Sequence, residues 1–451
     1  MNKSAFSSSL ACWLIANFLI LVILWSSLPD KSPSVEELFS NIRNFFVFQE
    51  QLYPYYHVIE QLEWISAFSH NEFASLQSDL SIVKPPKIFY DGHLLYHVTE
   101  SQGCRYKCNF TNYLYDLGVG DIAVFSEPFY AVDVEYLKQN GVLIAFESVE
   151  SPVHMRELTQ IQMQQVGFSH TLPPVDIFIT YLPWSQVPYM YPMFLRKTNR
   201  GKKFTSSELA ALLAKNSTHL LPLNHRKRRK LIAWLVSNGS PKNNRDSFAY
   251  LISNFISVSV DVYGGMGRET PPGWDPLQWI SEHYKFYLAF ENSNCRYYIT
   301  EKVTVNALRY GDPFKVYDRV SQMYSNYASK VETAIPSSSF RNGMVPIVLG
   351  AYKEDYESVL PPHSYINVDD FKSISELVQY LLYLDRNDTA YAEYFAWKEY
   401  GDIYVIEKRL DCRLCGFMHH LNAGLVKLGN YSPSRFMDPW SLCFYRELLP
   451  L

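Results

Sequence analysis

The chain has 451 residues, enough for two domains that each have a hydrophobic core. Hydrophobic residues make up 47% of the sequence and charged residues 19%, a globular composition that excludes a largely disordered chain. The formal net charge of -4 argues against a nucleic-acid-binding protein.

The N-terminal region is expected to anchor the chain in a membrane. Residues 10–28 form a nearly uninterrupted apolar run that is long enough to span a bilayer, and Lys3 precedes it with no acidic residue on that side. The positive-inside rule then makes residues 1–9 a cytosolic tail and gives a single-pass type II topology. A cleaved signal peptide is the alternative, but Trp25 lies where a cleavage site requires small side chains.

The next part of the sequence predicts a stem and a first domain. Residues 29–86 are predicted to form the stem, which ends at a pair of prolines. Short apolar runs separated by turns then indicate the buried parallel strands of an α/β domain over 87–223. The runs lie at 87–90, 121–125, 142–146 and 175–181, with a helix expected at 131–139.

A second α/β domain is predicted over 224–415. It begins with a basic run at 224–230, which we interpret as a solvated connector between the domains. Its strands are expected at 231–236, 258–263, 284–290, 345–349 and 365–368, and helices at 245–255 and 374–384. Residues 416–451 are predicted to form a C-terminal tail.

Residues 312–343 interrupt the second domain. The segment is polar, rich in serine and tyrosine, and lacks a clear amphipathic pattern. An irregular connection of this length is unusual inside a compact domain. Two interpretations are open: a surface loop, or the translated product of an intron or alternative exon.

The stretch 286–308 contains the most distinctive chemistry of the chain. An apolar strand is followed by a polar turn, and Thr300 can then cap a helix. This geometry directs backbone N–H groups and the positive end of a helix dipole towards an anion. Lys302 adds a positive charge where helices prefer carboxylates, so we expect it to face a ligand. The alternative is an ordinary βα unit with a solvated Glu301–Lys302 pair.

Several short sequence motifs resemble those of a known family. FENS, YITEK and NAL lie within 286–308, and VPIVLG, LPPHSYINVDDF and CRLC follow them at 345–350, 360–371 and 412–415. Together they resemble the alpha-1,3-fucosyltransferases of glycosyltransferase family 10. The resemblance implies an α/β fold of the GT-B type, with two Rossmann-like domains facing a cleft. The first domain would receive the acceptor and the second would bind GDP-fucose.

The resemblance also implies roles for residues of the second domain. Lys302 and Arg245 would contact the diphosphate of the donor, Glu301 its ribose, and Asn292 and Tyr298 the nucleotide and the fucose. Lysine and arginine are suited to stabilise a leaving diphosphate. The sequence contains no Asp-x-Asp motif, which disfavours a site built around a bound metal. No metal site and no required cofactor are therefore expected, although a divalent cation is allowed as a stimulant.

The general base is expected from the first domain. Glu150 follows a predicted strand and lies in an ESP segment like that of family members, where the glutamate is the base of an inverting transfer. A carboxylate at the C-terminal end of a strand faces the cleft of an open α/β sheet. Glu147, three residues earlier, is the alternative base.

The cysteines suit an oxidising compartment. Family members join cysteines before the first domain to a C-terminal CxxC, so the resemblance implies that Cys104 and Cys108 pair with Cys412 and Cys415. A zinc site made by the same two pairs is the alternative. Two further cysteines stay unassigned.

Five N-glycosylation sequons support a lumenal location, at Asn109, Asn216, Asn238, Asn387 and Asn430. The chain also departs from the family's pattern. Gly239 and Met266 stand where some invertebrate and plant members have cysteines, and both are absent here, as expected if those cysteines pair with each other. Tyr297 stands where many members have aspartate.

The sequence therefore predicts an inverting fucosyltransferase of the Golgi membrane with its catalytic part in the lumen. It would move fucose from GDP-fucose to N-acetylglucosamine of a glycoprotein or glycolipid glycan in alpha-1,3 linkage. An isoform inactivated by residues 312–343 is one alternative. A membrane-tethered glycan-binding protein is another, but such a protein does not need a base.

Overall fold

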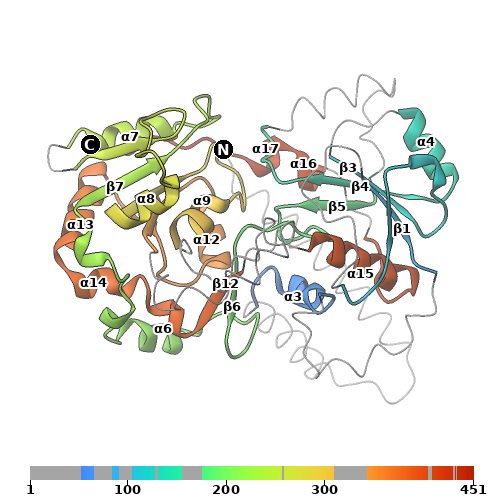
Figure 1. Cartoon of the computed structure of the whole chain (residues 1–451), viewed down its shortest axis with the longest axis horizontal. Coiled ribbons are helices and arrows are strands. Elements are labelled where there is room, and N and C mark those ends of the chain that lie inside the picture. The colour runs from blue at the N-terminus through green and yellow to red at the C-terminus, as the bar shows by residue number, and fades with distance from the viewer. Residues whose placement is uncertain are drawn as a thin grey trace, which may run out of the picture. The chain divides into compact units, whose positions relative to one another are not determined.

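The computed structural model describes residues 52–65, 84–90, 104–126, 131–154, 175–255, 258–308, 343–404, 409–429, 432 and 434–451 (Figure 1). By its contacts the chain divides into two compact units, Met1–Leu52 and Tyr53–Leu451. The predicted tail and anchor at 1–28 lie outside the described residues. Within the described ranges, none of the helices is both long enough and apolar enough to cross a bilayer.

A five-stranded parallel sheet forms the first part of the fold, in the order β2-β1-β3-β4-β5. Four of its strands confirm the apolar runs expected from the sequence, and most of their residues are buried. The strand β2 was not predicted, because it is three residues long and partly exposed. The strands are β1 (Lys87–Tyr90), β2 (Asn109–Thr111), β3 (Ile122–Phe125), β4 (Leu143–Ser148) and β5 (Ile177–Thr180).

Helices from both ends of the sequence cover this first sheet. Successive side chains of a strand point to opposite faces, so Ala145 and Phe146 of β4 pack in different clusters. On the Ala145 side lies α15 (Leu410–Asn422). On the Phe146 side lie α4 (Ala131–Gln139), α16 (Ser434–Met437) and α17 (Pro439–Leu442).

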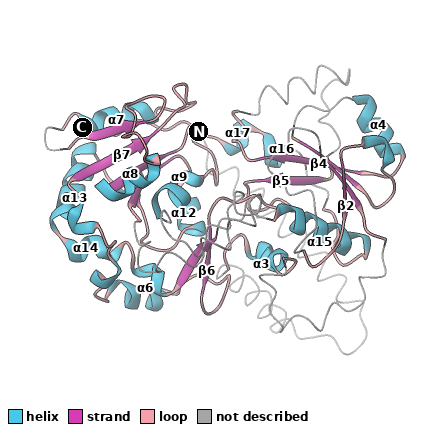
Figure 2. Ribbon diagram, viewed as in Figure 1, coloured by secondary structure: helices cyan, strands magenta, loops and turns pink. Residues whose placement is uncertain are grey.

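A second five-stranded parallel sheet follows, in the order β11-β10-β9-β7-β8. Figure 2 shows its strand β7 as a magenta arrow. All five strands had been expected from apolar runs in the sequence. The central strand β9 is buried along nearly its whole length and pairs with β7 and β10. The strands are β7 (Lys230–Leu235), β8 (Val260–Tyr263), β9 (Tyr284–Phe290), β10 (Val345–Leu349) and β11 (Ile366–Asn367).

Each face of the second sheet is also covered by helices. The predicted helices α7 (Arg245–Ser253) and α13 (Ile374–Arg386) pack on the face that includes Phe286 and Leu288. The opposite face packs against α8 (Pro276–His283), α9 (Glu301–Val303) and α12 (Lys353–Val359). The two sheets confirm the α/β class.

Two short strands, β6 (Met193–Arg196) and β12 (Gly401–Tyr404), pair antiparallel outside the two sheets. Gly401 allows the close approach, because a Cβ there would lie 2.4 Å from the carbonyl oxygen of Leu195. Two more α-helices are α6 (Ser206–Leu213), which has a capping box at Thr205, and α14 (Asp388–Glu393). Short 3-10 turns lie at Leu114–Asp116, Thr218–Leu220, His225–Lys227, Val368–Asp370 and Ala396–Glu399.

Residues 52–65, which the sequence assigned to the stem, are part of the folded body, so this stretch is not a spacer. It contains α3 (Tyr56–Leu62), and Tyr55 beside it is fully buried. The Tyr55 hydroxyl donates a 2.7 Å hydrogen bond to the carbonyl of Phe194 in β6. The helix α3 is only seven residues long and several of the buried side chains, including Tyr53 and Tyr55, lie outside it, so the packing of this segment left little periodic pattern in the sequence.

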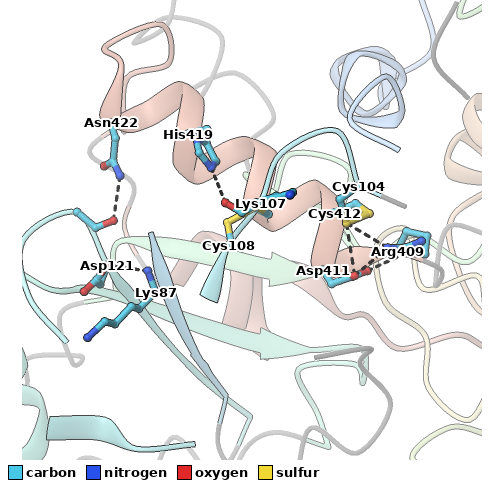
Figure 3. The surroundings of a disulfide bond; sticks show 12 residues. Lys87, Cys104, Lys107, Cys108, Asp121, Arg409, Asp411, Cys412, His419 and Asn422 are labelled. Carbon is cyan, nitrogen blue, oxygen red and sulfur yellow. Dashed lines mark hydrogen bonds and ion pairs between the residues drawn. A yellow bond between two sulfur atoms is a disulfide. The ribbon is translucent and has the colours of Figure 1, made fainter. Parts of the chain in front are cut away.

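The helix α15 packs on the first sheet, although the sequence placed its first half in the second domain. Figure 3 shows its polar contacts with the first sheet's loops. His419 Nε2 lies 2.9 Å from the Lys107 carbonyl oxygen, and Asn422 Nδ2 donates a 2.9 Å hydrogen bond to the Gly120 carbonyl. The chain thus returns to its first sheet after completing the second.

Three disulfides join distant parts of the chain. Cys104 bonds to Cys412 and Cys108 bonds to Cys415, in agreement with the pairing that the resemblance implies (Figure 3). The third, between Cys295 and Cys443, was left unassigned by the sequence. The first two bridges close loops with sequence separations of 308 and 307 residues. In the chain-entropy model each such loop stabilises the fold by about 6 kcal/mol.

Proteolysis without reduction tests the first two bridges. We expect one cross-linked species that contains both the Cys104–Cys108 peptide and the Cys412–Cys415 peptide, and we expect reduction to separate them. Mass spectrometry of the digest measures this. A local bridge between Cys412 and Cys415, or four free thiols, would contradict the structure.

The ends of the interrupting segment lie next to each other. Residues 309–342 are outside the described residues, but Ala307 and Met344 on either side of them are joined by a 2.9 Å hydrogen bond from the Met344 amide to the Ala307 carbonyl. Arg228 Nη1 donates a 3.0 Å hydrogen bond to the Gly343 carbonyl. The second sheet therefore continues into β10 as it would if the chain passed directly from 308 to 343.

Candidate functional site

Glu291, directly after β9, organises the turn that follows this strand. Its side chain is fully buried, and its two carboxylate oxygens accept hydrogen bonds from the amide and hydroxyl of Thr300, at 2.7 and 2.9 Å. Burial raises the pKa of Glu291, against the opposing effect of Lys302. In the sequence Glu291 is only one residue of the predicted polar turn, although an acid directly after five apolar strand residues was a signal that could have singled it out.

Lys302 lies between two carboxylates. Its Nζ is 3.1 Å from Glu291 Oε2, 3.0 Å from Glu301 Oε1 and 2.8 Å from Thr300 Oγ1. Burial favours the neutral amine, but Glu291 and Glu301 outweigh it, so the pKa of Lys302 is raised and the side chain stays charged. The side chain is 19% exposed, so the alternative of a fully solvated Glu301–Lys302 pair does not describe it.

Thr300 does not cap the helix as expected. It occupies the N-cap position, but its side chain makes no capping hydrogen bond and contacts Glu291 and Lys302 instead. The α-helix lasts for one turn and continues as a π-helix over Thr304–Leu308. A π-turn of this kind is frequent at functional sites. The predicted anion site therefore rests on Lys302 more than on a helix dipole.

Glu301 is the more exposed of the two acids, with 41% of its side chain accessible. Burial raises the pKa of Glu301, but the charge of the Lys302 ammonium and its hydrogen bond together outweigh burial, so the pKa of Glu301 is below its ordinary value. Glu291 is held by the amide and the hydroxyl of Thr300 and by Lys302, whereas Glu301 contacts Lys302 from a more exposed position. A ligand can therefore compete with Glu301 for Lys302 without disturbing Glu291.

Arg245 begins α7 and lies close to the end of β9. Its guanidinium donates to the carbonyls of Phe290 and Asn238, at 3.1 and 2.9 Å, and its Nε lies 3.8 Å from Asp246 Oδ1. The residue is 1% exposed, and burial lowers its pKa. In this arrangement Arg245 ties the loop before α7 to β9 and has little surface to offer a ligand.

Asn292 lies where this loop meets the turn after β9. The Lys242 amide donates a 2.7 Å hydrogen bond to the Asn292 carbonyl, and Asn243 Nδ2 donates to the Glu291 carbonyl and to Asn294 Oδ1, at 3.0 and 2.9 Å. These contacts bring Asn292, Arg245 and Lys302 to the carboxyl ends of neighbouring parallel strands, where ligands bind in open α/β sheets.

Glu150 and Tyr298 link the two sheets. Glu150 is exposed two residues after β4, and the Tyr298 hydroxyl donates a 2.9 Å hydrogen bond to its Oε2 across 148 positions of sequence. Burial, followed by the negative charge of Glu150, raises the pKa of Tyr298, so its hydroxyl stays protonated and remains a donor. Glu147, the alternative base, is 5% exposed within β4.

A second contact lies beside the first. Ser293 Oγ donates a 2.7 Å hydrogen bond to Ser151 Oγ, and both side chains are buried. The residues after β4 and those after β9 are thus held together at two adjacent points. The turn and helix after β9 thus carry Asn292, Tyr298, Glu301 and Lys302, and Tyr298 is hydrogen-bonded to Glu150. Arg245 is hydrogen-bonded to the Phe290 carbonyl at the end of the same strand.

The cysteine pairs do not form a zinc site. Two groups of side chains have ligand-like spacing in the described parts of the chain, and the cysteines in both are disulfide-bonded. Zinc binds cysteine as thiolate, which a disulfide sulfur does not provide. The groups are Cys108, Cys415 and His419, and Cys104, Asp411 and Cys412.

Three of the predicted sequons are open to modification. Asn109, Asn216 and Asn238 are exposed. Asn387 is only partly exposed, and its side chain accepts a 3.1 Å hydrogen bond from the Ala390 amide at the start of α14. Asn430 lies outside the described residues.

Gly239 and Met266 are neighbours in space. A Cβ on Gly239 would lie 2.5 Å from Met266 Sδ. The two positions are therefore close enough for the cysteine pair that the resemblance implies in other members. Here methionine fills the space that the glycine leaves, so this contact is kept without a bridge.

Comparison with known proteins bears mainly on the second sheet. The family model described as glycosyltransferase family 10 (fucosyltransferase) C-term matches residues 225–340 and 323–426. Glycoprotein 3-alpha-L-fucosyltransferase A of Drosophila melanogaster is 37% identical over 196 residues, which is 42% of this chain and 31% of that protein. The human 4-galactosyl-N-acetylglucosaminide 3-alpha-L-fucosyltransferase FUT6 is 36% identical over 178 residues, or 40% of each chain. The matches thus span less than half of these relatives.

A solved structure is also similar. The crystal structure of an alpha1,3-fucosyltransferase with GDP-fucose aligns over 75% of this chain and 92% of that chain, with 15% sequence identity and a TM-score of 0.40.

Proposed function

We propose that the chain is an inverting fucosyltransferase of glycosyltransferase family 10, because residues 225–426 match the model of the C-terminal part of that family. It transfers fucose from GDP-fucose to N-acetylglucosamine of a glycoprotein or glycolipid glycan, in alpha-1,3 linkage. The similarity to the 3-alpha-L-fucosyltransferases of Drosophila melanogaster and human supports this choice of donor sugar and linkage.

The observation that carries the proposal is the hydrogen bond from Tyr298 to Glu150. It holds an exposed carboxylate of the first sheet beside the segment with which the chain matches the family. A general base must lie within hydrogen-bonding reach of the hydroxyl that it deprotonates, on the acceptor side of the donor sugar. A protein that only binds glycans does not need such a carboxylate.

The reaction follows from these positions. Glu150 accepts the proton of the acceptor hydroxyl while the oxygen of that hydroxyl forms a bond to C1 of fucose. The bond between C1 and the diphosphate oxygen breaks, and its electron pair leaves with GDP. Attack opposite the leaving group inverts the configuration at C1. Tyr298 keeps Glu150 oriented towards this carbon.

The donor side depends on an exchange of partners at Lys302. The diphosphate of GDP-fucose draws the Lys302 ammonium, and Glu301, the more exposed of its two acids, turns to the ribose hydroxyls. Glu291 stays bound to Thr300 and keeps Lys302 in place. A charge-assisted contact at this point stabilises the negative charge that develops on the leaving group. Arg245 contributes by shaping the loop before α7 and, once that loop adjusts, by a direct phosphate contact; Asn292 lines the nucleotide.

The two sheets form a GT-B enzyme in this proposal, with the acceptor domain at 87–223 and the donor domain at 224–415. Residues 10–28 hold it in the Golgi membrane with type II topology, and the three disulfides suit the lumen. Residues with positive charge, rather than a metal, act on the diphosphate, so the enzyme requires no cofactor.

Residues 309–342 do not determine the fold in this proposal. Because Ala307 and Met344 are already hydrogen-bonded, we expect a variant that joins Leu308 directly to Gly343 to unfold within a few degrees of the wild type. Calorimetry of both proteins, followed by a transfer assay, checks this. If the full chain is inactive and the deletion variant is active, the chain is the inactive isoform. A deletion variant that does not fold would contradict the expectation that residues 309–342 are not needed for the fold.

Titration of the full chain with GDP tests the proposed donor class. We expect saturable binding of GDP and, as a control, much weaker binding of UDP, measured by calorimetry in detergent. Equal affinity for both nucleotides, or no binding of either, would exclude a GDP-fucose site.

A further inference from the structure

We propose that residues 442–450, near the end of the chain, form a strap that positions the donor-binding residues, and that Arg446 is its central positioning residue. This inference rests on the proposed function, because it concerns the site for GDP-fucose. The sequence predicted only a tail here.

The strap is joined first to the turn after β9. Cys443 is bonded to Cys295, and the two residues form an antiparallel bridge. On either side of the disulfide, the Arg296 amide donates to the Leu442 carbonyl at 2.7 Å and the Phe444 amide donates to the Asn294 carbonyl at 2.9 Å. The segment between Asn292 and Tyr298 is therefore fixed by two hydrogen bonds and one covalent bond.

Arg446 joins the strap to the loop after β10. Its side chain is 9% exposed, forms an ion pair with Asp369, and donates a 3.0 Å hydrogen bond to the Ala351 carbonyl. Gly350, the preceding residue, packs against Glu291 so closely that a Cβ on it would lie 2.7 Å from Glu291 Cβ. Arg446 thus supports Glu291, and through Glu291 it supports Lys302.

The same residue reaches the loop before α7. Asn244 Nδ2 donates a 2.9 Å hydrogen bond to the Arg446 carbonyl, and Asn244 directly precedes Arg245. Beyond Arg446, the Pro450 carbonyl accepts a 2.8 Å hydrogen bond from the Ile374 amide at the start of α13, and Leu449 packs against the core of the second sheet.

The strap contacts three loops. The turn after β9 carries Asn292, the loop before α7 leads into Arg245, and the loop after β10 packs against Glu291, which holds Lys302. Loops at the carboxyl ends of strands have no regular hydrogen-bond ladder to fix them. A strap that binds all three sets their mutual distances before the donor arrives, and such preorganisation reduces the ordering cost of binding. Damage to the strap should then raise the dissociation constant of GDP and the KM for GDP-fucose, with little effect on kcat.

The test compares three variants of the full chain in detergent with the wild type. Arg446→Met removes the ion pair and the carbonyl contact, and Arg446→Lys keeps the charge but not the planar fork. Leu449→Ala is the control, because Leu449 belongs to the strap and packs against the core of the second sheet. GDP affinity is measured by calorimetry, KM and kcat with GDP-fucose, and stability by thermal unfolding.

We expect Arg446→Met to raise the GDP dissociation constant and the donor KM by about 10- to 100-fold, the range produced by small displacements of binding groups, with kcat within about threefold of wild type. Arg446→Lys should fall in between. Leu449→Ala should lower the melting temperature and leave GDP affinity unchanged. If Arg446→Met does not fold, Asn244→Ala replaces it, because this change removes only the hydrogen bond from Asn244 to the Arg446 carbonyl. We expect it to raise the GDP dissociation constant by less than Arg446→Met.

The outcomes separate the inference from the proposed function. If the wild type binds GDP and the Arg446 and Asn244 variants bind it equally well, the strap is only structural and the inference is wrong. An equal loss of affinity in Leu449→Ala would also overturn it, because the effect would then follow stability alone. If the wild type does not bind GDP, the proposed function and the inference are both wrong.

Discussion

Replacing Glu150 with glutamine is expected to lower kcat by at least ~100-fold, the usual size of a general-base effect, while GDP binds nearly as well as to the wild type. Glutamine keeps the shape of the side chain and can still accept the hydrogen bond from Tyr298. It cannot accept a proton from the acceptor hydroxyl. Steady-state kinetics with a saturating acceptor, together with GDP calorimetry, measure both effects.

The matched control is Glu147→Gln. Glu147 is three residues earlier on β4 and is 5% exposed, whereas Glu150 is exposed beyond the strand. We expect Glu147→Gln to change kcat far less. If Glu147→Gln is the crippling change and Glu150→Gln is nearly neutral, the base has been assigned to the wrong carboxylate.

Tyr298→Phe addresses the same pair from the other side. The ring would still fill the space beside Tyr181, whose centroid is 5.1 Å away. The bond that orients Glu150 would be lost, so kcat should fall by less than in Glu150→Gln. A variant with unchanged kcat would show that this hydrogen bond does not contribute to transfer.

Replacing Lys302 with alanine is expected to abolish transfer and to weaken GDP binding by a few kcal/mol, the cost of losing a charge-assisted phosphate contact. The change also leaves Glu291 as a buried carboxylate without its ammonium, and breaking a buried pair costs roughly 3–5 kcal/mol of folding stability. GDP calorimetry and thermal unfolding must therefore be measured on the same preparation.

Lys285→Ala is the control for charge and burial. Lys285 is near the opposite end of β9, is 11% exposed, and pairs with Asp385 at 2.8 Å. We expect it to lower stability without changing GDP affinity. Unchanged GDP affinity and activity in folded Lys302→Ala would refute the assignment of the donor site.

The strands of both sheets were predictable because buried parallel strands are short apolar runs between turns. β9 is the clearest case, since all but one of its residues are buried and its limits were predicted without error. β6 and β12 were not predicted, because they pair with each other across 205 to 211 positions of sequence and the pairing depends on the close approach at Gly401. Pairing between distant segments leaves little trace in local periodicity.

The candidate site was predictable only in part. The residue types and order of 286–308 indicated Lys302, Glu301 and Tyr298, but not their partners. Glu291 was missed because burial of an acid next to Thr300 and Lys302 is a tertiary property. The return of α15 to the first sheet was equally hidden, since the helix follows the second domain in sequence and only its two cysteines pointed back.

Transfer of fucose can be measured by incubating the full chain with GDP-fucose and a glycan that ends in N-acetylglucosamine substituted by galactose. The product is then analysed by nuclear magnetic resonance. The account predicts a single fucose attached in alpha-1,3 linkage to N-acetylglucosamine, formed also after metal chelation, and lost in Glu150→Gln. GDP-fucose that stays intact, or fucose attached with retained configuration at C1, would contradict it.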